Sequence, residues 1–271
     1  MEKINKLKKL FNYYNLDGYI VPKNDEFFGE YIPENKDKLK FISNFSGSYG
    51  FALILKNKNY LFVDGRYTLQ AKIQSGKFFD IVTIPNRFPS DILKKKRLKI
   101  GFDPRLHTQK TLKIFFNKTN CKLVNINQDL IDKLWIKKEY NNLKRFYILP
   151  QKAVGQNYRL KINKLINVLN KKKIDFQFIS ASENIAWILN IRGQDSEFTP
   201  MPNAYLALDS NKKINLFCDL KKIKNSFKKK FKNIKFIDIK YTDLFLAKIK
   251  NKKILIDSSS CSIYFENILR K

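Results

Sequence analysis

The sequence has 271 residues, a formal net charge of +30, 44% hydrophobic residues and 14% aromatic residues. This content is enough for packed cores, which excludes a disordered chain, and the length fits one large domain or two of ordinary size. Apolar runs such as 51–55 last about five residues, far short of the roughly 20 that span a bilayer. We therefore expect a globular, cytoplasmic protein.

Hydrophobic periodicity predicts an α/β fold in the first half of the chain. Apolar residues at helical spacing predict a first helix over 2–15. Short apolar runs bounded by turn residues predict strands at 19–22, 51–55, 60–63, 80–84, 98–102 and 122–124. Further helices are expected at 66–75, 91–95 and 108–116. The runs 51–55 and 60–63 would form a hairpin, which places an antiparallel pair in a mixed sheet.

The same pattern starts again from about Gln151. It predicts helices at 159–169, 183–189 and 244–249, and strands at 175–179, 205–208, 214–218, 234–239 and 253–256. Three segments align in the same order: "LDGYIVP" (16–22) with "IDFQFIS" (174–180), "SNFSGS" (43–48) with "LNIRGQ" (189–194), and "NYLFVDGR" (59–66) with "INLFCDLK" (214–221).

These alignments predict two copies of one α/β unit, each a mixed β-sheet flanked by helices. We expect domains at 1–145 and 152–271 with a linker at about 140–152. Chance resemblance between two α/β units is the alternative.

The high positive charge raises the possibility of nucleic-acid binding. The lysines, however, are spread along the whole chain, with short runs at 94–96, 171–173 and 228–230. Arginine, which binds phosphate and guanine in bidentate fashion, is scarce. This distribution favours lysines that fill solvated surface positions over a nucleic-acid site.

The sequence offers few residues for a self-contained active site. Cys121, Cys218 and Cys261 are widely separated, which favours reduced, mostly buried thiols. His107 is the only histidine, and we expect it to have a surface or capping role. One histidine and scattered cysteines cannot supply a zinc or manganese site, and the acidic residues of 25–34 read as a polar loop. We therefore expect neither a catalytic residue nor a metal ligand in this chain.

Arg66 is unusual because it lies at a strand-to-helix corner in a chain that uses lysine for most of its positive charge. On residue chemistry alone, a salt bridge to Asp64 or Glu30 explains it. Such a pair contributes about 0–1 kcal/mol when exposed.

Several motifs together resemble a known family. They are "DEFFGEYI" (25–32), "FISNFSGSYG" (41–50), "FVDGRYTLQA" (62–71), "GFDPRL" (101–106), "LIDKLW" (130–135) and "ENIAWILNIRGQDSEFTPMPNAYLAL" (183–208). In this order they resemble the N-terminal region of Xaa-Pro aminopeptidase, also called aminopeptidase P, of the creatinase and methionine-aminopeptidase superfamily. The resemblance spans nearly the whole chain.

The resemblance implies two creatinase-type N-terminal domains followed by a catalytic pita-bread domain. In the family that third domain holds two divalent metals, manganese in the typical member, on two Asp, one His and two Glu. This sequence stops at Lys271, in what resembles the last helix of the second domain, so all five ligands would lie beyond it. We therefore expect this chain to bind no cofactor and to be inactive alone. The resemblance also implies proline-containing peptides as substrates and a homodimer for the full-length protein.

The resemblance gives Arg66 a role as a substrate-binding residue, because the arginine of "DGRY" belongs to the family's peptide-binding surface. A guanidinium suits peptide carbonyls or a carboxylate, since it presents several fixed donors. For Asn44, Ser46 and Arg192 only the surrounding motifs match.

Two other functions stay open at this point. The chain could be a stand-alone, non-catalytic interaction module of the same fold, or a basic nucleic-acid-binding protein. If a third domain follows, a partly exposed apolar patch is expected on the last helix, formed by Ile263, Phe265, Ile268 and Leu269.

Overall fold

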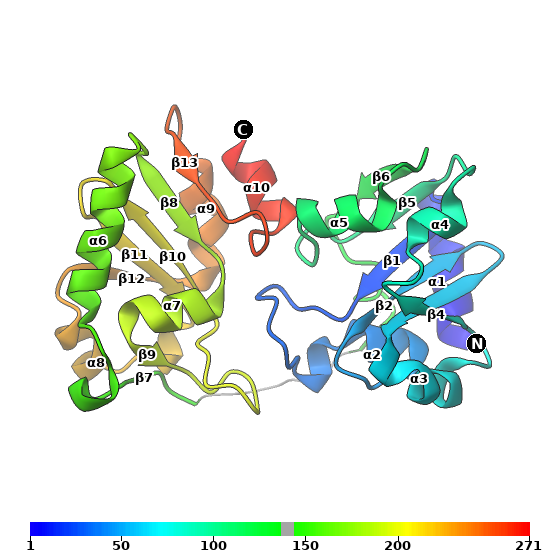
Figure 1. Cartoon of the computed structure of the whole chain (residues 1–271), viewed down its shortest axis with the longest axis horizontal. Helices are drawn as coiled ribbons and strands as arrows, with labels where there is room; N and C mark the ends of the chain where they lie inside the picture. The colour runs from blue at the N-terminus through cyan, green and yellow to red at the C-terminus, as the bar shows by residue number, and fades with distance from the viewer. Residues whose placement is uncertain (137–143) are drawn as a thin grey trace. The chain divides into compact units, whose positions relative to one another are not determined.

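The computed structural model describes residues 1–136 and 144–271 (Figure 1). The chain divides into two compact units. Unit 1 comprises Met1–Glu26 and Ile32–Tyr140, and unit 2 comprises Phe27–Tyr31 and Asn141–Lys271. The predicted linker at about 140–152 begins outside the described residues, and the predicted domain limits at 145 and 152 stay a prediction.

Within residues 1–136, six strands form one mixed sheet in the order β4-β3-β2-β1-β5-β6. The strands are β1 (Gly18–Pro22), β2 (Gly50–Leu55), β3 (Asn59–Asp64), β4 (Asp80–Ile84), β5 (Lys99–Phe102) and β6 (Lys122–Asn125). The pairs β1/β2 and β2/β3 are antiparallel, whereas β3/β4, β1/β5 and β5/β6 are parallel. Every residue of β1 and β2 is buried, as expected for strands covered on both faces.

Helices cover both faces of this sheet (Figure 1). They are α1 (Glu2–Tyr13), α2 (Lys38–Ser43), α3 (Thr68–Ser75), α4 (Pro89–Leu93) and α5 (Gln109–Phe116), with short 3₁₀ helices η1 (Glu34–Lys36) and η2 (Gly65–Tyr67). On one face, α1 to α3 bury apolar side chains such as Leu7, Phe11 and Leu39 against the strands. On the other, Phe115 of α5 stacks on Phe51 of β2.

Within residues 144–271, five strands form a second mixed sheet in the order β12-β11-β10-β8-β13. The strands of unit 2 are β7 (Tyr147–Ile148), β8 (Phe176–Ile179), β9 (Ile191–Arg192), β10 (Ala204–Asp209), β11 (Ile214–Cys218), β12 (Ile234–Asp238) and β13 (Ile254–Leu255). β7 and β9 form a separate antiparallel pair.

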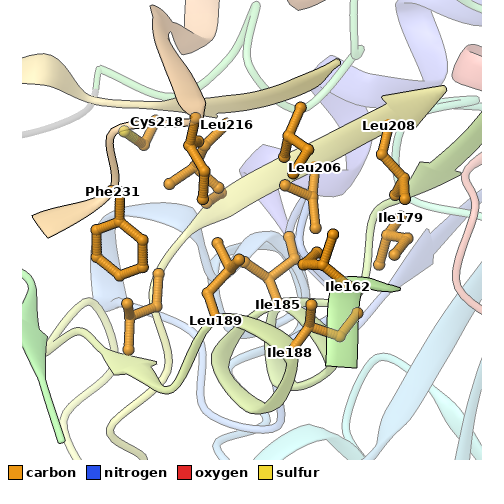
Figure 2. Close-up of a cluster of buried hydrophobic side chains, with 14 of the residues drawn as sticks. Ile162, Ile179, Ile185, Ile188, Leu189, Leu206, Leu208, Leu216, Cys218 and Phe231 are labelled. Carbon is orange, nitrogen blue, oxygen red and sulfur yellow. The ribbon is translucent and has the colours of Figure 1, made fainter. Parts of the chain in front are cut away.

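The helices of unit 2 are α6 (Tyr158–Lys171), α7 (Ser182–Leu189), α8 (Asn225–Lys230), α9 (Thr242–Ala247) and α10 (Ile263–Leu269), with 3₁₀ helices η3 (Gln151–Ala153), η4 (Leu220–Lys222) and η5 (Ile239–Tyr241). Figure 2 shows the core between the sheet and α6 and α7, where Ile162, Ile185 and Leu189 meet Leu206 and Leu216. Alternate strand residues fill a second core on the opposite face, against α9 and α10.

The two sheets repeat one topology. β8, β10, β11, β12 and β13 pair as β1, β2, β3, β4 and β5 do, with the same parallel and antiparallel neighbours. Even a side-chain bond recurs. Asp17 accepts a hydrogen bond from the backbone nitrogen of Lys99 at 2.9 Å, and Asp175 accepts one from that of Lys253 at 2.8 Å. The predicted fold class, two related α/β units with mixed sheets flanked by helices, is confirmed.

Two helix ends show the repeat at the level of backbone geometry. Asn44 caps the C-terminus of α2 with φ of 65°, and Asn190 caps that of α7 with φ of 55°, both left-handed. Asparagine adopts this conformation at a lower energetic cost than most side chains with a Cβ. The aligned segments "SNFSGS" and "LNIRGQ" therefore share a helix stop signal.

We expect Asn44→Ala to lower the free energy of unfolding of unit 1 by about 1 kcal/mol, because alanine is strained at this left-handed position. Asn44→Gly should cost little, since glycine adopts positive φ freely. Urea denaturation of both variants checks this. Equal losses would show that the asparagine side chain, and not the backbone conformation, matters.

The structure changes some predicted elements. The helix predicted at 66–75 is a 3₁₀ turn, η2, followed by α3. The predicted apolar patch on α10 is wrong for Ile263 and Phe265, which are buried, while Ile268 and Leu269 are half-buried. Phe265 packs edge-on against Phe178 and Tyr205 in the second core.

In the described parts of the chain, every helix is too short or too polar to span a bilayer.

Candidate functional site

Arg66 lies in the tight turn that follows β3. Asp64, the last residue of that strand, accepts a hydrogen bond from the backbone nitrogen of Arg66 at 2.9 Å and so caps η2. The same carboxylate accepts from the Arg66 guanidinium, with Nη2 to Oδ2 at 2.7 Å and Nε to the two oxygens at 3.2 and 3.3 Å. The ion pair with Asp64 that residue chemistry predicted is thus present.

The Arg66–Asp64 pair lies at the protein surface. The Arg66 side chain is 73% exposed, and its guanidinium carbon lies 5.3 Å from the centroid of the Tyr67 ring. The hydrogen bond from Arg66 lowers the pKa of the Asp64 carboxyl, which therefore stays ionised at neutral pH. Exposed pairs add about 0–1 kcal/mol to stability, so the pair orients a surface guanidinium more than it stabilises the fold.

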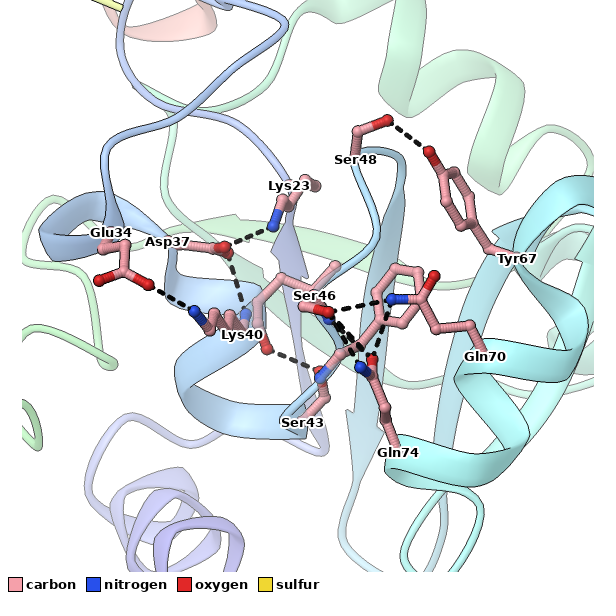
Figure 3. A network of polar contacts seen from close by, with 12 residues as sticks. Lys23, Glu34, Asp37, Lys40, Ser43, Ser46, Ser48, Tyr67, Gln70 and Gln74 are labelled. Atoms are coloured by element: carbon pink, nitrogen blue, oxygen red, sulfur yellow. Dashed lines mark hydrogen bonds and ion pairs between the residues drawn. The ribbon is translucent and has the colours of Figure 1, made fainter. Parts of the chain in front are cut away.

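A network of small polar side chains borders this turn (Figure 3). Ser46 follows the end of α2, and its hydroxyl accepts from Gln70 Nε2 and Gln74 Nε2, each at 2.9 Å. Its backbone nitrogen donates to Gln74 Oε1 at 3.0 Å. Because Gln70 and Gln74 lie one turn apart on α3, the helix fixes the loop after α2 beside η2.

The loop after α2 also contacts Tyr67 directly. The hydroxyls of Ser48 and Tyr67 lie 2.8 Å apart (Figure 3), and the Tyr67 ring packs edge-on against Phe45. A Cβ added to Gly47 would lie 2.2 Å from the Phe45 ring and 2.9 Å from the Tyr67 ring. Only glycine therefore fits between the two rings, which locks Tyr67 in place next to Arg66.

At the equivalent turn of unit 2, polar residues bond to other residues of the same unit. Asp219 caps η4 by accepting from the backbone nitrogen of Lys221 at 3.0 Å, as Asp64 does for Arg66. The next residue, Lys222, forms a partly buried ion pair with Asp195, which also accepts from the backbone nitrogen of Asn203 at 2.7 Å. In this place unit 1 has the hydroxyl pair of Ser48 and Tyr67.

The other motif residues of unit 2 also bond within the fold. The Arg192 guanidinium donates to the carbonyls of Ala186 and Ile191 at 3.1 and 2.9 Å. Asn190 Oδ1 accepts from the buried Lys161 ammonium at 2.6 Å. Arg192 and Asn190 therefore hold α6, α7 and β9 together, and the candidate site is the unit 1 corner around Arg66.

Three carboxylates of unit 1 cluster around a lysine. Asp103, Asp129 and Asp132 surround the Lys38 ammonium, which lies 3.7, 2.9 and 3.0 Å from their oxygens. A lysine thus supplies the cation. No group of three or more His, Cys, Asp or Glu in the described residues suits a metal ion, so these residues do not fit a two-metal centre.

Carboxylates of the acidic loop at 25–34 also lie close to lysine ammonium groups. Lys36 pairs with Glu26 and lies 4.0 Å from Asp25, and Lys40 pairs with Glu34 at 2.6 Å. Asp25, Glu26 and Glu34 thus each lie within ion-pair distance of a lysine.

His107 is fully buried, so the predicted surface or capping role is wrong. Its ring packs edge-on against Phe102, and burial lowers its pKa to about 3, which keeps the imidazole neutral. Neither ring nitrogen has a hydrogen-bond partner within residues 1–136 and 144–271.

Cys218 and Cys261 are buried free thiols, and burial raises the pKa of each thiol to about 12. Cys121 is a half-buried free thiol.

Two family models, both described as the creatinase/prolidase N-terminal domain, match residues 3–134 and 137–271. A probable Xaa-Pro aminopeptidase P of Laccaria bicolor is 31% identical over 229 residues, which are 80% of this chain and 35% of that protein. Xaa-Pro aminopeptidase 1 of Dictyostelium discoideum is 29% identical over 248 residues, 84% of this chain and 39% of that protein. The chain thus spans little more than a third of the length of these curated relatives.

One solved structure resembles nearly the whole chain. It is X-prolyl aminopeptidase from Caenorhabditis elegans, described as a cytosolic enzyme with a di-nuclear active site. The TM-score is 0.82 at 24% identity, over 91% of this chain and 43% of that one. At this identity the likeness shows that the two proteins share a fold.

Proposed function

The chain belongs to the creatinase/prolidase N-terminal domain family, which it represents twice, and from this premise we propose that it is the N-terminal portion of an Xaa-Pro aminopeptidase. Such an enzyme releases the N-terminal residue from peptides with proline in second place. In this proposal the two units take part in substrate selection and mediate the association of subunits. The observation that carries the proposal is the succession of two such domains. Together they match about a third of the length of a curated Xaa-Pro aminopeptidase.

Arg66 is the residue that we assign to substrate binding. Its guanidinium is exposed, oriented by Asp64 and bordered by the fixed ring of Tyr67. A charged fork of this kind donates strong hydrogen bonds to the carbonyl or carboxylate oxygens of a peptide. The counterpart in unit 2, Lys221, lacks the planar fork, so unit 1 is the better candidate for the substrate-facing unit.

The hydrolytic chemistry would come from another part of the enzyme. Two divalent metals, manganese in our proposal, activate the attacking water in two-metal hydrolysis. The described residues do not fit such a centre, so we assign the metals to the portion of the relatives that this chain does not span. We further propose a cytoplasmic homodimer for the full-length enzyme.

The 271-residue chain should show no measurable peptidase activity, because two-metal hydrolysis needs ligands that its described residues do not provide. Purified chain is incubated with manganese and an Xaa-Pro tripeptide, and release of the N-terminal residue is followed by mass spectrometry. Manganese-dependent release by the chain itself would overturn this assignment.

A chimera tests the assignment positively. Replacing the N-terminal region of the Dictyostelium enzyme with this chain should retain activity, and Arg66→Ala in the chimera should lower kcat/KM about tenfold or more, the effect of losing a charged hydrogen bond. Lys221→Ala, at the equivalent turn of unit 2, is the matched control and should change little. A folded, inactive chimera would favour a non-catalytic interaction module.

A further inference from the structure

Asp64 makes a contact that its counterpart in unit 2 does not make. Asp64, the last residue of β3, and Asp219, the residue after β11, each cap the following 3₁₀ turn by accepting from one backbone nitrogen. Asp64 in addition binds the Arg66 guanidinium with both carboxylate oxygens. In the described part of unit 2, Asp219 and Lys221 form no side-chain ion pair. The cap is therefore common to the fold, and the ion pair is specific to unit 1.

We propose that Asp64 is a positioning residue that holds the Arg66 guanidinium ready for the peptide substrate. This inference rests on the proposed function and names a residue that acts through Arg66. The carboxylate is itself fixed, because the backbone nitrogen of Arg66 donates to Oδ1 at 2.9 Å while Nη2 donates to Oδ2 at 2.7 Å. An exposed arginine loses side-chain entropy when it binds, and an arginine that is already held loses less.

Tyr67 is a second neighbour of the Arg66 guanidinium. Its ring centroid lies 5.3 Å from the guanidinium carbon, and its own position is set by Ser48 and Phe45. The guanidinium thus contacts a carboxylate and lies near an aromatic ring, and both are anchored in unit 1. These neighbours, and not charge alone, define where a ligand atom would bind Arg66.

The charge of the pair also indicates which substrate atom fits. Asp64 is ionised at neutral pH, since the hydrogen bond from Arg66 lowers its pKa, so the pair has no net charge. A second carboxylate brought to Arg66 would be repelled by Asp64. A backbone carbonyl of the peptide avoids this repulsion, so we assign Arg66 to a peptide carbonyl and expect amidated peptides to bind as well as free acids.

The test uses the variant Asp64→Asn in the 271-residue chain. Asparagine keeps an oxygen that accepts from the backbone nitrogen of Arg66, so the cap remains while the charge is lost. Asp219→Asn makes the same change at the equivalent cap of unit 2. NMR follows the Nε resonance of Arg66, identified by its loss in Arg66→Lys, during titration with an amidated Xaa-Pro tripeptide.

Asp64→Asn should shift the Arg66 Nε resonance and speed its hydrogen exchange, and should weaken peptide binding about threefold to tenfold. Asp219→Asn should change neither. If Asp64→Asn leaves the Nε resonance unchanged, the positioning role is overturned whatever the peptide does. If the resonance shifts but peptide perturbs Arg66 in neither wild type nor variant, the substrate role of Arg66 fails, and with it the functional meaning of Asp64.

Discussion

Replacing Lys38 with methionine is expected to lower the free energy of unfolding of unit 1 by about 3–5 kcal/mol. The Lys38 ammonium lies among Asp103, Asp129 and Asp132, and only Asp132 is substantially exposed. Removing the Lys38 ammonium leaves buried carboxylates close together, which is costly because burial strengthens their repulsion. The cluster joins α2 to the segment around 129–132, so its loss should loosen both.

Urea denaturation in a Trp187→Phe background measures this effect, because the remaining tryptophan, Trp135, stacks on Phe41 in unit 1. Lys40→Met is the matched control on the same helix. Lys40 pairs with Glu34 at the surface, so its loss should cost at most about 1 kcal/mol. Similar losses in the two variants would show that the buried cluster contributes no more than a surface pair.

The same cluster gives unit 1 a pH dependence of known sign. Burial, followed by the charge of Asp129, raises the pKa of Asp103 from 3.8 to about 7. A carboxyl that binds its proton more tightly in the folded state stabilises the fold fully below pH 3.8, and this contribution is lost as the pH rises through about 7. Asp103→Asn should therefore be close to wild type near pH 4 and more stable than wild type by about 1 kcal/mol or more at pH 8. A difference that grows toward low pH would contradict this assignment.

Replacing Phe265 with alanine is expected to lower the free energy of unfolding of unit 2 by about 3–5 kcal/mol. The ring is buried, with centroids 5.2 Å from Phe178 and 4.9 Å from Tyr205 in edge-on geometry. The variant would lose this burial and leave a cavity between α10 and the sheet, which the surrounding strands can fill only in part.

Leu269→Ala on the same helix is the control, since Leu269 is only half-buried. It should cost clearly less than Phe265→Ala. Urea denaturation in a Trp135→Phe background, with Trp187 as the probe of unit 2, gives both values. Equal and small losses would restore the sequence-based expectation that these residues form an exposed patch.

The hydrophobic pattern predicted the strands of the two main sheets and the internal repeat, because a buried strand shows as a run of apolar residues in the local sequence. It missed the short strands β7 and β9. Apolar residues make up most of β1 and β3 and of their counterparts β8 and β11, and the aligned asparagines mark helix ends in both copies. α2 was not predicted, since its six residues are too few to show a helical period. Its signal was Asp37, which caps the helix by accepting from the backbone nitrogen of Lys40.

The candidate site was predicted only in part. The pair of Arg66 with Asp64 is local, so the sequence indicated it. Gln70 and Gln74 were missed, although their spacing of four on a helix places them on one face, because their partner Ser46 lies 28 residues from Gln74. The Lys38 cluster was missed for the same reason, since Lys38 and Asp132 are 94 residues apart. Contacts at such distances depend on how the strands are ordered.

The burial of His107, Cys218 and Cys261 also gives each unit its own chemical reporter. Acylating reagents need an accessible imidazole, and thiol reagents need a thiolate, which burial suppresses in both cysteines. These side chains can react only when their unit opens. The acylation rate of His107 therefore measures the opening of unit 1, and the alkylation rate of Cys218 and Cys261 measures the opening of unit 2, in one sample of unmodified protein.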